Sequence, residues 1–151
     1  MLRQLIMFVV GSLLLQPGIA SAQLGSNLAS VQADSAALRG SIQTVTGAHY
    51  AVYEIQTDAQ LKVREYVRND GIVFALGWSG PVLPDLQALL GPYFAAYSNA
   101  VATLAHPGLH RSLHIETGEL VLESSGHLRA FAGRAYLPAL LPAAVSVSEL
   151  R

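Results

Sequence analysis

The sequence predicts an α+β fold in which a single helix packs on one face of an antiparallel sheet. Two regions, 50–78 and 113–136, alternate apolar and polar residues with a period of two, which is typical of strands buried on one face. Between them, residues 86–104 repeat their apolar residues with the period of an α-helix. This order predicts two three-stranded meanders with one long helix between them.

The first meander contains three expected strands joined by short polar turns. Asn69-Asp70-Gly71 precedes the third strand, and Asp-Gly tolerates the positive φ that hairpin turns require. Side chains alternate along a strand, so one face of the third strand is expected to be largely apolar. The expected strands are 50–56, 61–68 and 72–78, and the apolar face of the third would carry Ile72, Phe74, Leu76 and Trp78.

The middle region predicts one long amphipathic helix that is kinked at Pro92. Pro84 suits the first turn, where its missing amide hydrogen is not needed, and the carboxylate of Asp85 is favourable at the positive end of the helix dipole. Pro92 removes a hydrogen bond within the helix and is expected to kink or split it. The apolar stripe passes this position in phase: Leu86, Leu89, Leu90, Tyr93, Phe94, Tyr97, Val101 and Leu104.

The second meander is expected from three shorter strands, 113–116, 119–124 and 127–136. Residues 48–151 then form a single α+β domain, of the size that buries its own core without a metal or a disulfide. Residues 23–47 are rich in Ala, Ser, Gln and Gly, and we expect a loosely ordered lead-in there.

Residues 1–22 have the pattern of a secretory signal peptide. Arg3 precedes an apolar run from Leu5 to Leu15, and Ala20-Ser21-Ala22 supplies the small residues of an A-x-A cleavage site. The apolar run is shorter than the roughly 20 residues that span a bilayer, so we expect cleavage after Ala22 and no remaining membrane span. The chain is therefore expected to be exported to the periplasm or secreted.

Composition excludes several classes of protein. The 151 residues are 52% apolar and 13% charged, contain no cysteine, and carry a formal charge of −1. Without cysteine there is no disulfide, thiolate nucleophile or cysteine-based metal site, and a charge near zero offers no attraction for nucleic acid. Gly77-Trp78-Ser79-Gly80 lacks the closing glycine of a nucleophile elbow, because Pro81 stands there. We therefore predict no catalytic residue and no cofactor.

Three histidines form a weak candidate metal site. His106, His110 and His114 recur at every fourth residue, which on a helix would stack three imidazoles on one face. Pro107 and Gly108 interrupt that helix, so a solvated loop is the alternative.

The last expected strand carries the main candidates for binding. As one continuous strand it would place His127 and Arg129 on one face, and Arg134 and Tyr136 on the other. Arginine presents a planar fork that matches a carboxylate or phosphate, so these residues, with the turn at Trp78, are candidates for contact with a small anionic ligand or a protein partner. The alternative is that the arginines form cross-strand ion pairs with Glu65, Glu119 or Glu123.

Several short motifs follow one another in a fixed order after Gly47. They are Arg64-Glu65-Tyr66-Val67, Gly71-Ile72-Val73-Phe74-Ala75, Trp78-Ser79-Gly80-Pro81, Pro84-Asp85-Leu86 with Leu89-Leu90-Gly91 and Tyr93-Phe94, and Gly126-His127-Leu128-Arg129-Ala130-Phe131 with Gly133-Arg134-Ala135-Tyr136 and Pro138. This arrangement resembles a family of small exported proteobacterial proteins, DUF2844, a domain of unknown function. The resemblance implies a bacterial envelope protein and assigns no activity or cofactor.

Three functions are consistent with these observations. The preferred hypothesis is a non-catalytic binding or accessory module of the cell envelope. The second is a small periplasmic enzyme that acts on an anionic substrate with His127 as general base. The third is a structural or stress-protective envelope protein without a discrete ligand. Convergence of the polar side chains in a concave pocket would favour the enzyme, whereas an ion-paired sheet would favour the others.

Overall fold

The structure is a computed structural model that describes residues 23–104 and 112–150. Its strands are β1 (Ser41–Thr46), β2 (Tyr50–Gln56), β3 (Lys62–Arg68), β4 (Val73–Gly80), β5 (Ser112–Glu116), β6 (Val121–His127) and β7 (Ala130–Tyr136). Its α-helices are α1 (Leu28–Ala37), α2 (Leu86–Leu90) and α3 (Phe94–Ala102), and short 3-10 turns occur at Gly91–Tyr93, Pro138–Leu140 and Val147–Glu149.

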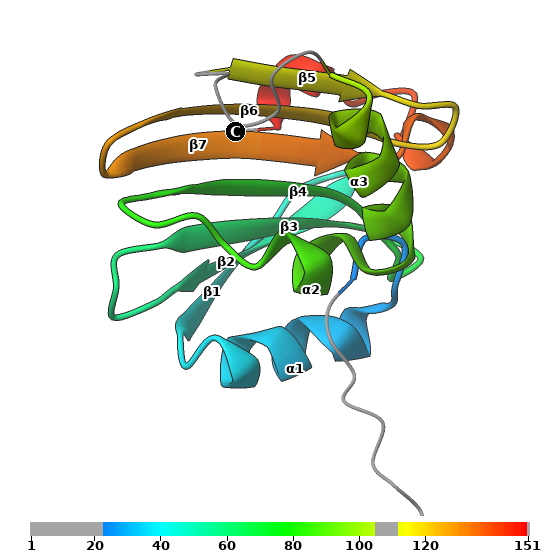
Figure 1. The fold of residues 1–151 in the computed structure, drawn as a ribbon. Coiled ribbons are helices and arrows are strands. Elements are labelled where there is room, and N and C mark those ends of the chain that lie inside the picture. Colours follow the sequence, from blue (N-terminus) through cyan, green and yellow to red (C-terminus); the bar gives the residue numbers. More distant parts are fainter. Residues whose placement is uncertain (1–22, 105–111, 151) are drawn as a thin grey trace, which may run out of the picture.

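All seven strands form one antiparallel sheet, in the order β1-β2-β3-β4-β7-β6-β5. The α+β class expected from the sequence is confirmed, although strands dominate the fold. The pairing of β4 with β7 joins the two halves of the chain, with Leu76 opposite Ala135. The connection between β4 and β5 carries α2 and α3, which lie over one face of the sheet (Figure 1).

We call the face of the sheet that α2 and α3 cover the helix face. The main core lies between this face and the helices. Leu24 and Val31 from the N-terminal segment, and Leu89 and Leu90 from α2, are almost completely buried there. Each such side chain contributes roughly 1.5–3 kcal/mol through burial of apolar surface. Their partners on the sheet are Val63, Val67, Val73, Leu76, Trp78, Ile115, Leu122 and Ala135.

The opposite face of the sheet, which we call the polar face, is only partly covered. The C-terminal segment, residues 137–150, packs Val145 and Leu150 against Tyr66, Phe74 and Ala75 in a second, smaller cluster. Its last turn begins with a capping box, in which the side chain of Ser146 accepts a hydrogen bond and Glu149 bonds back to the Ser146 amide. The rest of the polar face, over β5, β6 and β7, is open.

The helical region is split at Gly91 and Pro92, one of the two outcomes expected there, and a single kinked helix over residues 86–104 is not what the structure contains. Asp85 caps α2 by accepting hydrogen bonds from the amides of Gln87 and Ala88, as its position predicts. The chain then leaves the α-conformation at Gly91, which has a positive φ of 52°, and Pro92 cannot donate to the preceding turn. Two short helices separated by a 3-10 turn result.

The expected pair of three-stranded meanders is also not what the structure contains, because residues 23–47 add α1 and β1 to the first half. This segment, expected as a loose lead-in, is fastened by Leu24 and Val31 in the core and by a hydrogen bond from the Gly25 amide to the Val73 carbonyl oxygen. β1 then pairs with β2 along its whole length.

Two further differences concern individual strands. The expected strand 127–136 is interrupted by a hairpin turn at Leu128 and Arg129, where Arg129 has a positive φ of 62°. In β4, Phe74 packs on the polar face and not beside Leu76, because the register with β3 shifts there and inserts an extra residue.

The close contact between Gly133 and Trp78 provides a test of the packing. A β-carbon on Gly133 would overlap the Cζ2 atom of Trp78 and would lie 2.7 Å from the Glu123 carbonyl oxygen. We predict that Gly133→Ala lowers the free energy of unfolding by about 1–3 kcal/mol, because a buried ring and a strand must move. Gly118→Ala is the matched control: nothing lies within 4 Å of the added carbon, and its effect in urea denaturation is expected within about 0.5 kcal/mol. Equal effects of the two variants would contradict this packing.

Candidate functional site

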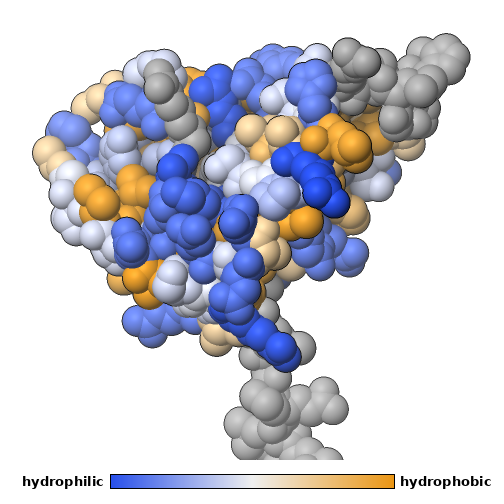
Figure 2. Space-filling model, turned by 90° about the vertical axis from the view of Figure 1, so that its left-hand side faces the viewer, coloured by the Kyte–Doolittle hydropathy of each residue, from blue (hydrophilic) through white to orange (hydrophobic). Residues whose placement is uncertain are grey.

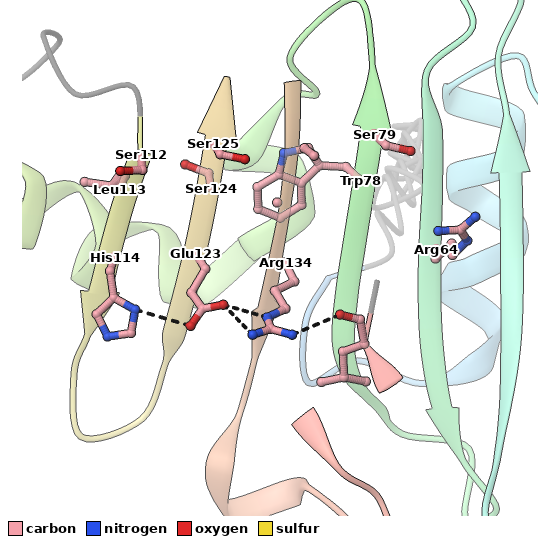
Figure 3. Close-up of a pocket in the computed structure, with 13 residues that line it drawn as sticks. Arg64, Trp78, Ser79, Ser112, Leu113, His114, Glu123, Ser124, Ser125 and Arg134 are labelled. Carbon is pink, nitrogen blue, oxygen red and sulfur yellow. Dashed lines mark hydrogen bonds and ion pairs between the residues drawn. The ribbon is translucent and has the colours of Figure 1, made fainter. Parts of the chain in front are cut away.

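A pocket of about 680 Å³ lies on the polar face, over β4, β5, β6 and β7. Figure 3 looks onto the sheet, whose strands form the floor of the pocket, and draws the lining residues as sticks. This volume is in the range of small-molecule sites in proteins. The residues that line it are Arg64, Trp78, Ser79, Ser112, Leu113, His114, Glu123, Ser124, Ser125, Ala132, Gly133, Arg134 and Leu150.

The floor of the pocket is a row of small side chains. Ser79 pairs with Ala132, Ala132 with Ser125, and Ser125 with Ser112, so the four residues lie side by side on neighbouring strands. Small side chains leave the space that larger ones would fill. Within the described residues, none of the three serine hydroxyls has a hydrogen-bond partner in the protein. The floor therefore offers three hydroxyls as donors and acceptors.

One wall of the pocket is a row of ion-paired side chains that lies two residues further along the strands than the serine row. The Arg134 Nε atom donates to Glu123 Oε2 at 2.7 Å, and His114 Nδ1 lies 3.4 Å from Glu123 Oε1 (Figure 3). Arg64 stands in the same row on β3, and Gly77 separates it from Arg134.

Arg134 also holds the C-terminal segment against the sheet. Its Nη1 atom donates to the carbonyl oxygens of Val147 at 2.8 Å and Leu150 at 3.3 Å. Hydrogen bonds from a charged donor contribute roughly 1.5–3 kcal/mol each, and these bonds satisfy carbonyls at the end of a helical turn. Leu150 is itself part of the pocket wall, so Arg134 shapes the pocket by positioning this segment.

The row continues beyond the pocket at Glu54. Arg64 Nε donates to Glu54 Oε2 at 2.7 Å, and Lys62 Nζ lies 3.3 Å from Glu54 Oε1. Partial burial favours the neutral form of Glu54, but the hydrogen bonds and charges of Arg64 and Lys62 outweigh it and lower the pKa of this carboxyl. The group is thus held as a carboxylate, and its contribution to stability is lost as the pH falls through the lowered pKa.

The structure separates the residues that the sequence singled out for binding. Arg134 and Trp78 line the pocket, whereas His127, Arg129 and Tyr136 are not among its lining residues. His127 ends β6 and Arg129 stands in the turn after it, so the expectation that they share one strand with Arg134 is wrong. The cross-strand alternative holds for Arg134, which pairs with Glu123.

Trp78 and Tyr136 are mainly packing residues. Trp78 is 3% exposed and belongs to the main core, and its indole nitrogen bonds none of the described residues. Tyr136 packs against the smaller cluster on the polar face. Burial raises the pKa of the Tyr136 phenol, the charge of Glu123 adds to this shift, and the charge of Arg134 opposes it.

Sequence reasoning missed most of the pocket. Ser112 and Ser125 were not singled out, Ser79 entered only through the turn at Trp78, and His114 only as a metal candidate. These residues lie on β4, β5 and β6, which the β4–β7 and β6–β7 pairings bring together. The only signal available was the recurrence of small or polar residues at alternate positions in each strand. The strand order needed to combine them was not predicted.

The metal hypothesis can be followed only at His114. No group of three or more His, Asp or Glu side chains suited to a metal occurs within residues 23–104 and 112–150. His114 lies on β5 beside Glu116 and Glu123, and His106 and His110 lie outside the described residues. Within the same ranges, no helix is long and apolar enough to cross a membrane.

Fold and site together define a small α+β domain with helices on one face of an antiparallel sheet and a pocket on the other. Comparison with family models matches residues 20–150 to the family described as "Protein of unknown function (DUF2844)", and the chain belongs to this family. No curated protein and no solved structure matches it.

The two roles of Arg134 lead to a stability prediction. Arg134→Gln removes the charge that pairs with Glu123 and the donors to the C-terminal segment, and we predict a loss of about 2 kcal/mol in urea denaturation. Amide exchange of residues 147–150 should also accelerate. Lys62→Gln is the control, because Lys62 is half exposed and bonds only Glu54, and a loss below about 1 kcal/mol is expected. Unchanged exchange in Arg134→Gln would contradict this role.

Proposed function

We propose that this chain is an exported protein of the bacterial envelope that acts as a non-catalytic binding module. The pocket on the polar face is the proposed binding site, and its ligand is a small polar molecule. The three serine hydroxyls on the pocket floor carry the proposal, since they lie in one row and bond no described residue of the protein. Export is supported by the signal-peptide pattern of residues 1–22.

The wall of the pocket favours binding over catalysis. A general base must reach the proton that it abstracts, and a nucleophile needs a base beside it. Arg134 and Glu123 are engaged with each other, and His114 faces carboxylates. His127, the base of the enzyme hypothesis, does not line the pocket. Ion pairs of this kind hold a fixed polar surface, which suits recognition.

The ligand is expected to be polar and to carry an acceptor group. The lining contains two guanidinium groups and an imidazole against one carboxylate. The serine hydroxyls can donate to the same ligand or accept from it. A small molecule that combines an anionic or hydroxylated group with an apolar part fits the pocket, because Leu113, Ala132 and Leu150 line it beside the polar groups. In a structural protein without a ligand, the three serine hydroxyls on the pocket floor would bind no ligand.

Export is tested through the leader. When the full chain is produced in a Gram-negative host, the periplasmic fraction should contain a protein whose measured mass corresponds to a chain that begins at Gln23. Ala20→Arg and Ala22→Arg should block this processing, because the cleavage site requires small side chains. Retention of an intact Met1 in the cytoplasm would contradict the proposed location.

The binding site is tested by filling it. A library of small polar fragments, including carboxylic acids, sugars and amino acids, is screened by two-dimensional NMR of ¹⁵N-labelled protein. We expect hits to shift the amides of Ser79, Ser125 and Ala132, and Ala132→Trp to abolish them by occupying the floor. Ala144→Trp, at an exposed position of the C-terminal segment, should leave the hits unchanged. The absence of hits at the pocket, or hits that survive Ala132→Trp, would contradict the proposal.

A further inference from the structure

Among the residues that the structure describes, nothing covers one edge of the sheet, and this edge has none of the usual protection. β1 pairs with β2 on one side only, and all six of its residues are exposed. Its sequence, Ser-Ile-Gln-Thr-Val-Thr, contains no charge and no proline. Proteins normally protect such edges with lysine, proline, a bulge or a covering segment, because an open edge pairs with other strands. In Figure 1, β1 lies at the end of the sheet opposite β5.

Apolar side chains lie on both faces of this edge. Val45 is 69% exposed on the polar face, and Ile42 is 40% exposed on the helix face. Both are β-branched residues, which favour strands that are covered by neighbours. Addition of one more strand would bury part of each side chain and would satisfy the outward backbone groups.

We propose that β1 pairs with β1 of a second copy of this chain, so that two sheets join edge to edge in a two-fold symmetric dimer. The occupant is a second copy because the outward backbone groups of β1 can pair with those of its own copy, and the uncharged strand brings no like charges together in that pairing. Dimers of this kind are isologous, since the same surface is used by both subunits.

The backbone of β1 fixes the register of this pairing. The Gly47 amide donates to the Tyr50 carbonyl oxygen at 2.8 Å, which makes these residues a hydrogen-bonded pair of the β1–β2 ladder. Hydrogen-bonded pairs alternate in antiparallel ladders, so the odd-numbered residues of β1 bond β2 and the even-numbered residues point outward. The outward residues are Ile42, Thr44 and Thr46.

A two-fold axis at Thr44 matches outward residues with outward residues. Thr44 then lies opposite Thr44 of the second copy, and Ile42 lies opposite Thr46. Each hydrogen-bonded pair of an antiparallel ladder exchanges two backbone hydrogen bonds, so the three pairs form about six. On the polar face, Val45 lies opposite Gln43. Side chains of the same sheet face meet throughout, as cross-strand pairing requires.

Charge distinguishes β1 from the other edge. The same alternation turns Ser112, His114 and Glu116 of β5 outward, and two of these three residues are ionisable. Self-pairing of β5 would bring two imidazoles together at its centre, whereas self-pairing of β1 brings no charge near another. The pocket lies over β4 to β5, so a dimer through β1 leaves both pockets open.

The size of the contact sets the expected affinity. Stable complexes bury about 800 Å² on each partner, which is more than one six-residue strand presents. We therefore expect a reversible dimer with a dissociation constant in the micromolar range and not a permanent one.

Sedimentation velocity of the purified protein between about 1 and 300 μM tests the dimer, because this range brackets a micromolar dissociation constant. Thr44→Pro removes an outward amide without removing a bond to β2, and it should raise the dissociation constant at least about tenfold. Glu116→Pro removes an outward amide from β5, at the other edge of the sheet, and should leave the dissociation constant unchanged. A monomer throughout this range, or a dimer that Thr44→Pro leaves intact, would overturn the proposal, and pairing through β5 would appear as an effect of Glu116→Pro.

A charge exchange tests the register without proline. Because Thr44 lies on the axis, Thr44→Lys places two like charges opposite each other and should weaken the dimer about fivefold, and Thr44→Glu should do the same. An equimolar mixture of the two variants should form a heterodimer at least as tight as the unmodified homodimer, detected by native mass spectrometry. If the mixture does not recover dimer, Thr44 is not on the axis and the proposed register is wrong.

Discussion

The pairing of β4 with β7 is the contact on which the rest of the structure depends. β4 is buried along residues 73–78, with helices on one side and the C-terminal segment on the other, so it is the centre of both apolar clusters. Its alignment with β7 places Trp78 against Gly133 and brings Arg134 into the row that contains Arg64. Core and pocket thus follow from one register.

Arg134 connects this core to the open part of the polar face. It is bonded to Glu123 on the neighbouring strand and to two carbonyls of the C-terminal segment. Because these bonds fix the position of the Arg134 side chain, its main role is to hold the shape of the pocket, which is therefore formed before any ligand binds. The serine hydroxyls beside it bond none of the residues that the structure describes. Arg134 and Glu123 therefore support the pocket, whereas the serines are the proposed binding residues.

The sequence predicted the α+β class, the helix cap at Asp85 and the approximate position of most strands, because each depends on residues close together in the chain. β1 was missed because both of its faces are exposed, so no apolar alternation marks it. The apolar stripe stays in phase across Gly91 and Pro92, so the sequence did not decide between a kink and a split at Pro92. The pocket requires the order of strands from distant segments, and local patterns carry no information about that order.

The β4–β7 pairing also bears on how the chain reaches its native state. Strands β1 to β4, and β5 to β7, each form hairpins between sequence neighbours, but Leu76 meets Ala135 only after a loop of roughly sixty residues has closed, and closure of such loops slows folding. Until then β4 has an unpaired side with apolar residues on both faces. The step that joins the halves is therefore the interval in which this chain is most prone to aggregate.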